Sequence, residues 1–273
     1  MASVPRGGAD PVTIAVNPLA KIEILEIGDG RRCAIVDEFL ADPASLVRYS
    51  QAHASEFRIR PHTYPGPGRV VGAPCMEQIQ RFIRSQLSRH FPFHRSAIKL
   101  TAGLSMVTLR PEQLSNFQRI CHIDPRHAQD RRTFAGLVYL FDNAALGGTA
   151  FYRWKRQAIA FEAMARELRD PQAAHRYLQA NSAYYREAPR YMTQSNDIAE
   201  LMEVVPAKWN RFVFYDGEYP HSGHITRPDL LTQDFSTGRL SLNLFASVRP
   251  TPADTAPHEG ATPRGDARRL RFD

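Results

Sequence analysis

The chain has 273 residues, of which 43% are hydrophobic and 23% charged, and a formal net charge of +7. No apolar run approaches the ~18 residues that a membrane span needs, and residues 1–10 lack the apolar stretch of a secretory signal. We therefore expect a cytoplasmic protein with no membrane partner and a sizeable core.

The positive charge comes mostly from arginines that are scattered along the chain. Basic residues do not alternate with aromatics as they do on a nucleic-acid stacking surface, so we expect no nucleic-acid partner. The three cysteines, Cys33, Cys75 and Cys121, form no CxxC pair. This spacing argues against a disulfide framework and against a zinc site.

Both ends of the chain differ in composition from the middle. Residues 1–20 and 250–273 are rich in proline, glycine or charge and poor in large apolar side chains. Such segments bury too little surface to offset their ordering entropy. We predict a flexible arm, a flexible tail and a single domain at 21–249.

The first elements of this domain mix strand and helix. Residues 33–39 are apolar and β-branched and predict a strand. A helix is predicted over 43–53, with Asp42 as its N-cap. Proline and glycine predict a loop at 64–74, and apolar residues at helical spacing predict a second helix over 76–90.

The remaining chain favours short strands separated by turn residues. They are predicted at 104–109, 134–141, 149–154, 211–215 and 240–248. Helices followed by several short strands predict an α+β protein with a β-sandwich or jelly-roll core.

One segment of helical composition, 156–201, interrupts these strands. We predict that it is a helical insertion on the β scaffold. It contains Tyr184, Tyr185 and Tyr191, which suit either a lid over the site or a contact in a homodimer.

The candidate metal ligands begin with the sequence His122-Ile123-Asp124. Side chains two residues apart point the same way from an extended chain, so one metal can contact both. Two imidazoles and one carboxylate on an Fe(II) ion leave three of its coordination positions open. An HxD motif alone arises by chance, so the motifs that follow decide its meaning.

Three further motifs follow the HxD in order. Gly147-Gly148 precedes a strand, and Pro220-His221-Ser222-Gly223 follows the strand at 211–215. Arg239 and Ser241 then share one face of an alternating strand. An arginine inside a β core needs an anionic partner, and its planar fork matches a carboxylate.

The series HxD, GG-x-x-F, PHxG and R-x-S resembles the Fe(II)/2-oxoglutarate-dependent dioxygenase superfamily, closest to its prolyl-hydroxylase-like branch. The opening of that branch is also similar to residues 36–40, and the resemblance covers 33–248 outside the insertion. It implies a double-stranded β-helix, a jelly-roll variant, with a metal at its open end.

The resemblance also implies the roles of individual residues. His122, Asp124 and His221 would bind Fe(II), and Arg239 with Ser241 would bind the distal carboxylate of 2-oxoglutarate. O₂ would be the second co-substrate, and succinate and CO₂ would be released. Asp124 occupies the position that halogenating members leave vacant, so hydroxylation is the expected outcome, with desaturation or ring closure as alternatives.

Several neighbouring residues compete for these roles. His224 is the rival third ligand, and residues three apart on a strand face opposite ways, so only one of the two histidines can point at the metal. We favour His221 because the pattern Pro220-His221-Ser222-Gly223 resembles the family at that position. Asn116 and Gln118 would share the face of His122 on a regular strand and could contact substrate or co-substrate. The branch usually has a tyrosine on this approach, and the tyrosine is missing here.

The expected substrate is a small molecule, amino-acid-like or otherwise acidic, because arginines surround the predicted site. Those flanking the HxD are Arg119, Arg131 and Arg132. The main alternative function is a catalytically silent jelly-roll protein that binds or senses a metal. A cupin-type hydrolase or isomerase would leave Arg239 without its carboxylate partner.

Overall fold

The computed structural model describes residues 12, 14–59, 64–95, 98–126, 128 and 130–250. Most of the predicted arm, and the predicted tail after Pro250, lie outside these residues. Within the arm, Ile14 is buried and Val16 forms a β-bridge with Leu40. The chain is therefore packed on the domain from Ile14 onwards.

Two strands and two helices form the N-terminal part. The strands β1 (Ile22–Gly28) and β2 (Arg31–Val36) make an antiparallel hairpin. The helices are α1 (Ala44–Ala52) and α2 (Glu77–Ser85). Helix α1 begins one residue later than predicted, so Pro43 and not Asp42 is its N-cap. The Ser45 amide still donates to Asp42 Oδ1 at 3.1 Å.

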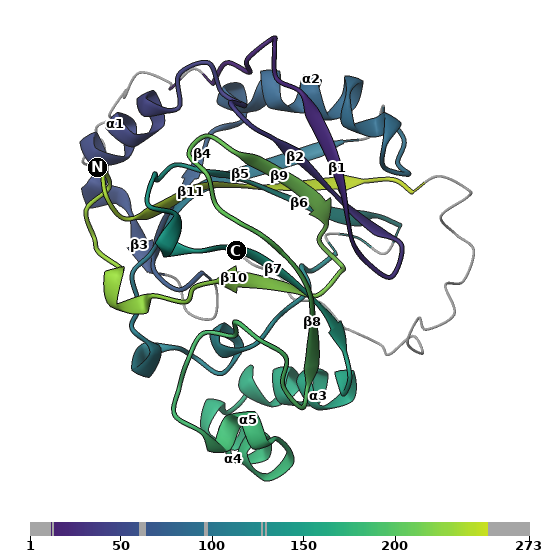
Figure 1. The fold of residues 1–273 in the computed structure, drawn as a ribbon, viewed down its shortest axis with the longest axis vertical. Coiled ribbons are helices and arrows are strands. Elements are labelled where there is room, and N and C mark those ends of the chain that lie inside the picture. The colour runs from purple at the N-terminus through teal and green to yellow at the C-terminus, as the bar shows by residue number, and fades with distance from the viewer. Residues whose placement is uncertain are drawn as a thin grey trace, which may run out of the picture.

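An eight-stranded antiparallel sheet carries most of the domain. Its order is β1-β2-β9-β6-β11-β5-β4-β3. The strands not yet defined are β3 (Arg58–Ile59), β4 (Pro67–Val71), β5 (Lys99–Val107), β6 (Arg132–Tyr139), β9 (Phe212–Asp216) and β11 (Arg239–Val248). One face of this sheet packs on α1 and α2 through side chains such as Leu46 and Ile79 (Figure 1).

A second, three-stranded antiparallel sheet has the order β10-β7-β8. Its strands are β7 (Gly148–Trp154), β8 (Ala199–Val205) and β10 (His221–His224). The face that packs on the large sheet, through residues such as Phe151 and Tyr215, is called the inner face here. The predicted combination of helices and antiparallel strands is thus confirmed.

The helices α3 (Gln157–Glu167), α4 (Pro171–Asn181) and α5 (Ala183–Arg186) cover the outer face of the small sheet (Figure 1). They connect β7 to β8, whose ends pair at Trp154 and Ala199. The last residues of the predicted insertion, from Ala199, already belong to β8. The four layers are therefore helices, large sheet, small sheet and helices.

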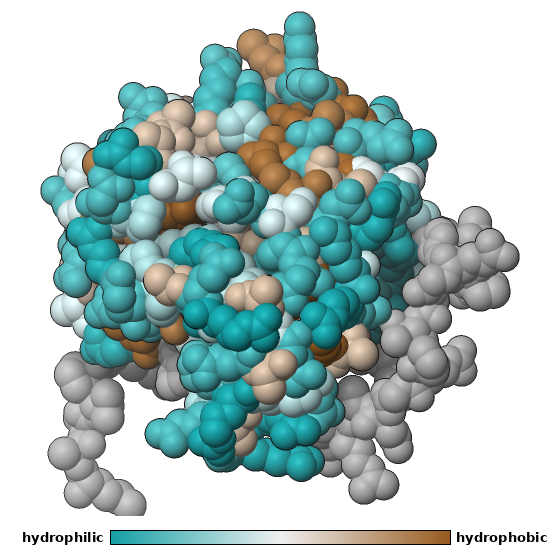
Figure 2. All heavy atoms as spheres, turned by 60° about the horizontal axis from the view of Figure 1, so that its bottom comes forward, coloured by the Kyte–Doolittle hydropathy of each residue, from teal (hydrophilic) through white to brown (hydrophobic). Residues whose placement is uncertain are grey.

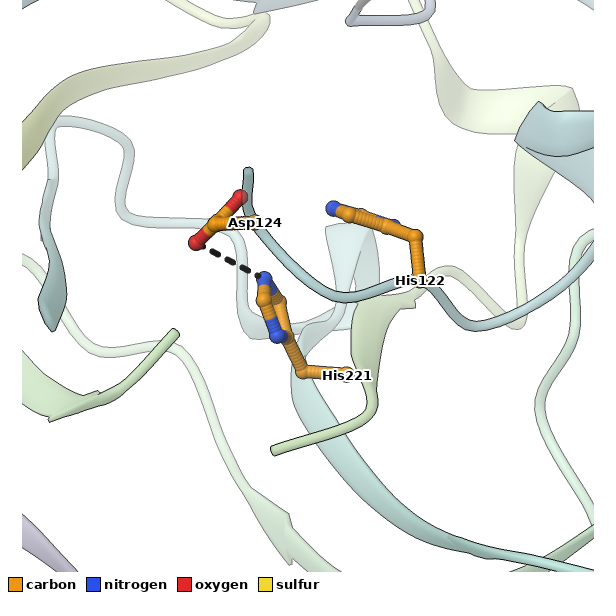
Figure 3. Close-up of side chains that lie close together, drawn as sticks. All are labelled: His122, Asp124 and His221. Atoms are coloured by element: carbon orange, nitrogen blue, oxygen red, sulfur yellow. Dashed lines mark ion pairs between the residues drawn. The ribbon is translucent and has the colours of Figure 1, made fainter. Parts of the chain in front are cut away.

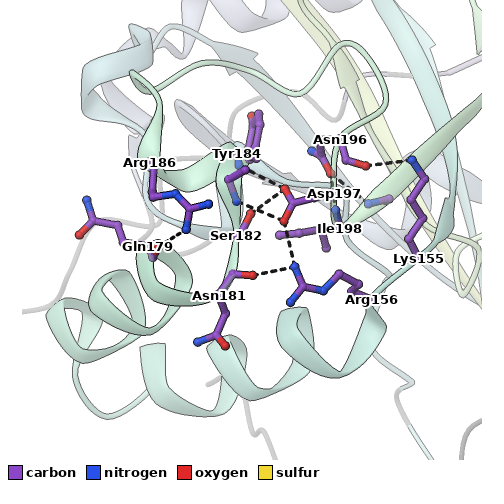
Figure 4. Close-up of polar contacts among 12 residues, drawn as sticks. Lys155, Arg156, Gln179, Asn181, Ser182, Tyr184, Arg186, Asn196, Asp197 and Ile198 are labelled. Atoms are coloured by element: carbon purple, nitrogen blue, oxygen red, sulfur yellow. Dashed lines mark hydrogen bonds and ion pairs between the residues drawn. The ribbon is translucent and has the colours of Figure 1, made fainter.

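The carboxylate of Asp197 links several parts of this insertion. Asp197 accepts hydrogen bonds from Ser182 Oγ at 2.9 Å and from the Tyr184 amide at 3.1 Å, and it pairs with Arg156 at 3.0 Å (Figure 4). Arg156 precedes α3 and Ser182 follows α4. Asp197 thus ties both ends of the helical pair to the chain that enters β8.

The insertion keeps its aromatic side chains inside. Tyr184, Tyr185 and Tyr191 are buried within the chain, while the face of the molecule on this side is mostly hydrophilic (Figure 2). Leu168 is its one exposed large hydrophobic residue among those described. No described helix has the length and apolar character to cross a membrane.

Candidate metal centre

Two segments far apart in sequence meet at the predicted ligands. His122 and His221 form an antiparallel bridge in which each backbone amide donates to the other carbonyl at 2.9 Å. The Asp124 amide donates to the Gly217 carbonyl at 2.7 Å. Backbone hydrogen bonds therefore place the HxD beside the first residue of β10.

The three side chains point into the same space (Figure 3). Their potential ligand atoms all lie within 4.8 Å of one another. His221 Nε2 is 3.6 Å from Asp124 Oδ2, and the two imidazole rings are 4.5 Å apart between centroids. The distances suit a single metal ion among the three groups.

The tautomer of His221 follows from its hydrogen bond. Nδ1 lies 2.9 Å from the Tyr219 carbonyl oxygen, and because that oxygen can only accept, Nδ1 carries the proton. Nε2 then keeps its lone pair and faces Asp124. A backbone carbonyl on the second ring nitrogen is a common partner of a metal-binding histidine.

The pKa of both imidazoles is lowered. Burial lowers the pKa of His221 to about 4, opposed by the Tyr219 carbonyl and Asp216. Desolvation and the charge of His221 lower the pKa of His122, opposed by Asp124. Because His122 is exposed, desolvation has less effect on its pKa than on that of His221. Both rings are neutral near pH 7, the form that binds a metal.

Gly217 leaves room for the carboxylate of the group. A Cβ added at this glycine would lie 2.7 Å from Asp124 Oδ2 and 3.0 Å from the Thr133 carbonyl oxygen. Real Cβ atoms do not approach so closely, so a side chain here would displace Asp124. The turn between β9 and β10 is therefore shaped around the ligand.

Arg239 lies between the two sheets, with 3% of its surface exposed. It begins β11 in the large sheet and reaches the small sheet, where Nη2 donates to the Gly148 carbonyl at 2.9 Å. Nε donates to the Leu146 carbonyl at 3.0 Å. No carboxylate of the described residues lies within salt-bridge distance of its guanidinium. The charge is thus surrounded by neutral dipoles.

Tyr64 joins this arginine from the loop between β3 and β4. Its hydroxyl accepts from Arg239 Nη1 at 2.9 Å and lies 3.1 Å from Ser241 Oγ. Tyr64 is not among the residues predicted for the site, because in sequence it belongs to a Pro/Gly-rich loop distant from the HxD. Arg239, Tyr64 and Ser241 form a group that we call the arginine cradle.

The structure separates the rival ligand from His122, Asp124 and His221, which we call the metal group. His224 lies outside that group, and its Nε2 is 3.1 Å from the Thr193 carbonyl oxygen on the outer side of the sheet. His221 and His224 therefore face opposite ways, as the strand spacing predicts.

The approach to the HxD is not a regular strand. It contains a 3₁₀ turn, Phe117–Arg119. Asn116 donates to Glu167 at 2.6 Å instead of facing the site, and Gln118 donates to the Tyr64 carbonyl at 3.4 Å. Because the backbone turns here, the condition under which Asn116 and Gln118 would share the face of His122 is not met.

The arginines near the HxD have structural contacts. Arg119 packs against the ring of Tyr185 at 4.7 Å. Arg132 pairs with Asp216, and Arg131 donates to the Ser247 carbonyl at 3.1 Å.

Comparison with protein families gives one match, over residues 18–246, to DUF6445, a family of unknown function. Because the match covers most of the chain, the protein belongs to this family. Comparison with curated proteins gives no match.

Solved structures of low similarity include three proteins. The first is HygX from Streptomyces hygroscopicus with nickel, 2-oxoglutarate and hygromycin B bound, with 11% identity, a TM-score of 0.40 and coverage of 80% of this chain and 83% of that one. The second is EvdO2 from Micromonospora carbonacea var. aurantiaca, with 10% identity, a TM-score of 0.37 and coverage of 84% of this chain and 94% of that one. The third is the Kdo hydroxylase KdoO, a non-heme Fe(II) alphaketoglutarate dependent dioxygenase in complex with succinate and Fe(III), with 12% identity, a TM-score of 0.33 and coverage of 64% of this chain and 61% of that one. The chain thus spans less than two thirds of KdoO. Similarity this low carries no weight for the reaction.

Proposed function

We propose that this DUF6445 protein is a non-haem Fe(II)- and 2-oxoglutarate-dependent oxygenase. In this proposal His122, Asp124 and His221 hold the metal, and Arg239 holds the distal carboxylate of the co-substrate. The observation that carries the proposal is a buried arginine with no carboxylate partner among the described residues, in the same inter-sheet space as a two-histidine, one-carboxylate group.

The donor set suits Fe(II). Two neutral imidazoles and one carboxylate are the ligands of non-haem iron oxygenases that keep open coordination positions. Asp124 and His221 are buried, which limits competition from water. The hydrogen bond of His221 to the Tyr219 carbonyl fixes the orientation of its ring.

The arginine cradle suits a carboxylate. A guanidinium has five N–H groups, and Arg239 uses one each toward Leu146, Gly148 and Tyr64. The remaining N–H groups can bind an anion in bidentate fashion. Ser241 and Tyr64 add hydroxyl groups beside it. A carboxylate there would neutralise a charge that is costly to bury alone.

With O₂ as the oxidant, bound Fe(II) and 2-oxoglutarate would supply an oxidative decarboxylation that yields succinate and CO₂ and oxidises a substrate C–H bond. The chain itself orients the two groups. Arg239 would set the distance of the co-substrate from His221, and the aromatic side chains between the sheets would exclude water. Asp124 retains its carboxylate, so hydroxylation is the proposed outcome, with desaturation or ring closure as variants.

The proposal extends to fold and substrate. Two facing antiparallel sheets with the site between them suit a double-stranded β-helix, or jelly roll, of the prolyl-hydroxylase-like branch. The proposed substrate is a small, amino-acid-like or acidic metabolite, in keeping with the net charge of +7. Succinate release should be screened over amino acids and acidic natural-product precursors. Inactivity on all of them together with activity on a peptide would overturn this substrate class.

The reaction class is tested by anaerobic titration of the full chain with Fe(II) and 2-oxoglutarate. A weak visible charge-transfer band should appear only when both are present. Absence of the band in the wild-type protein would contradict the proposal. A normal band with no succinate from any substrate would favour the silent binding or sensing protein.

A further inference from the structure

Asp216 ends β9 and lies 4% exposed beside the metal group. Its Oδ2 contacts two guanidinium groups, that of Arg31 at 2.6 Å and that of Arg132. Arg31 begins β2 and Arg132 begins β6, the two strands that flank β9 in the large sheet. One carboxylate thus joins the same end of three neighbouring strands.

Asp216 also shapes the turn that leads to β10. Its Oδ1 accepts the Glu218 amide at 3.1 Å, and its carbonyl accepts the Tyr219 amide at 3.0 Å. The Gly217 amide between them donates to the Thr133 carbonyl at 2.9 Å. These bonds fix the backbone of residues 216–219.

The carbonyl groups of this turn bind two of the candidate metal ligands, one through its backbone and one through its side chain. The Gly217 carbonyl accepts the Asp124 amide at 2.7 Å, and the Tyr219 carbonyl accepts from His221 Nδ1 at 2.9 Å. A shift of the turn would therefore move Asp124 and rotate the ring of His221. Asp216 acts on both without being a ligand.

We propose that Asp216, held by Arg31 and Arg132, is a positioning residue of the metal site. The inference rests on the proposed function only in requiring that the site binds a divalent metal. Loss of the carboxylate charge leaves the largely buried guanidinium of Arg132 without this partner and releases the turn. Outer partners of metal ligands typically contribute about 10–100-fold to metal affinity.

The same pair of strands provides a matched control. At the far end of β9, Arg211 precedes the strand and pairs with Asp37, which follows β2. Asp37 also contacts Lys208 at 2.8 Å. Asp37 is thus a second aspartate with two cationic partners, but it lies at the opposite end from the metal group and is more exposed than Asp216.

The test titrates the full-length protein with Co(II) and records the visible d–d spectrum. We expect Asp216→Asn to weaken Co(II) binding by about 10–100-fold and to alter the spectrum of the bound ion. Asp37→Asn should bind Co(II) with wild-type affinity and spectrum. The spectrum reports the geometry of the ligands around the bound ion. A variant that is only less stable would show the wild-type spectrum in its folded fraction.

A milder variant covers the case in which Asp216→Asn does not fold. Arg31→Gln removes the more exposed of the two cations, with 30% of that side chain exposed, and should weaken Co(II) binding in the same direction by less. Wild-type Co(II) affinity and spectrum in Asp216→Asn, or in Arg31→Gln where only that variant folds, would overturn the positioning role alone. Failure of the wild-type protein to bind Co(II) would overturn the metal site and the inference together.

Discussion

The two faces of β10 have different surroundings, although the strand has only four residues, whose side chains alternate between the faces. On the inner face, His221 points at the metal group and Gly223 lies beside Arg239. On the outer face, Ser222 contacts the Tyr152 hydroxyl at 3.5 Å and His224 contacts the Thr193 carbonyl at 3.1 Å. The strand therefore separates a candidate site from a structural interface.

The polar groups on the two sides are satisfied in different ways. On the outer side, tyrosine hydroxyls donate to backbone carbonyls, as Tyr152 does to Met192 at 2.9 Å and Tyr185 to Asn116 at 2.6 Å. On the inner side, Arg239 is buried with no carboxylate within salt-bridge distance among the residues described. Burial of a charge alone therefore does not mark a site, because Arg119 is equally buried and packs on an aromatic ring. Arg239 differs in lying between the sheets, in the same space as the candidate metal ligands.

The sharpest contrast is between the two histidines of β10. His221→Ala should weaken Fe(II) binding by more than the ~10–100-fold that loss of an outer partner costs, because it removes a ligand. His224→Ala should leave Fe(II) affinity unchanged. Anaerobic Fe(II) titration of both variants checks this, and equal affinities would erase the distinction between the faces.

Two buried arginines provide the second contrast. Arg239→Met should weaken 2-oxoglutarate binding by about 2–5 kcal/mol, the cost of losing one partner of a buried charge pair, and leave metal affinity intact. Arg119→Met is the control, since Arg119 is equally buried but packs on Tyr185. Calorimetric titration of the metal-loaded proteins with 2-oxoglutarate measures both. A similar loss in both variants would contradict the assignment.

A smaller effect is expected at the hydroxyl of Tyr64. Tyr64→Phe removes one hydrogen-bonding group beside Arg239, worth about 0.5–1.5 kcal/mol. The KM for 2-oxoglutarate should rise by the corresponding roughly 2- to 12-fold, with Fe(II) affinity unchanged. An unaltered KM would place Tyr64 outside the co-substrate site.

The smallest effect on the site is expected from the outer face. Tyr152→Phe leaves the Met192 carbonyl without its donor and should lower the free energy of unfolding by about 1–3 kcal/mol. Fe(II) and 2-oxoglutarate affinities should remain at wild-type values. Denaturant unfolding measures the change in stability, and the same titrations measure the two affinities. A weakened metal affinity would show that the two faces are coupled.

Local patterns predicted the clustered ligands. His122 and Asp124 are two residues apart, so their proximity needs only an extended backbone, and His221 follows an apolar strand that has to cross the core. The strands at 134–141 and 240–248 appear as β6 and β11 for the same reason. Short-range spacing and strong apolar character predict such local structure because they do not depend on contacts with distant residues.

Other features depended on distant partners. The strand β8 has the sequence AELMEVV, whose first residues favour a helix, but pairing with β7 decides its conformation. Tyr64 reaches Arg239 only because β4 pairs with β5, which in turn pairs with β11. Neither its loop nor its neighbours along the chain indicate that contact. Tertiary pairing therefore determined what local spacing could not.

The insertion is, in topological terms, an enlarged hairpin loop. Its entry and exit face each other across one ladder rung, Trp154 and Ala199, so the small sheet could close with a short turn in its place. Yet Tyr184 and Tyr185 bind the carbonyls of Arg119 and Asn116, just before His122. A chain shortened here would keep its strand order and lose the support behind its first metal ligand, so loop length and metal affinity should vary together among related sequences.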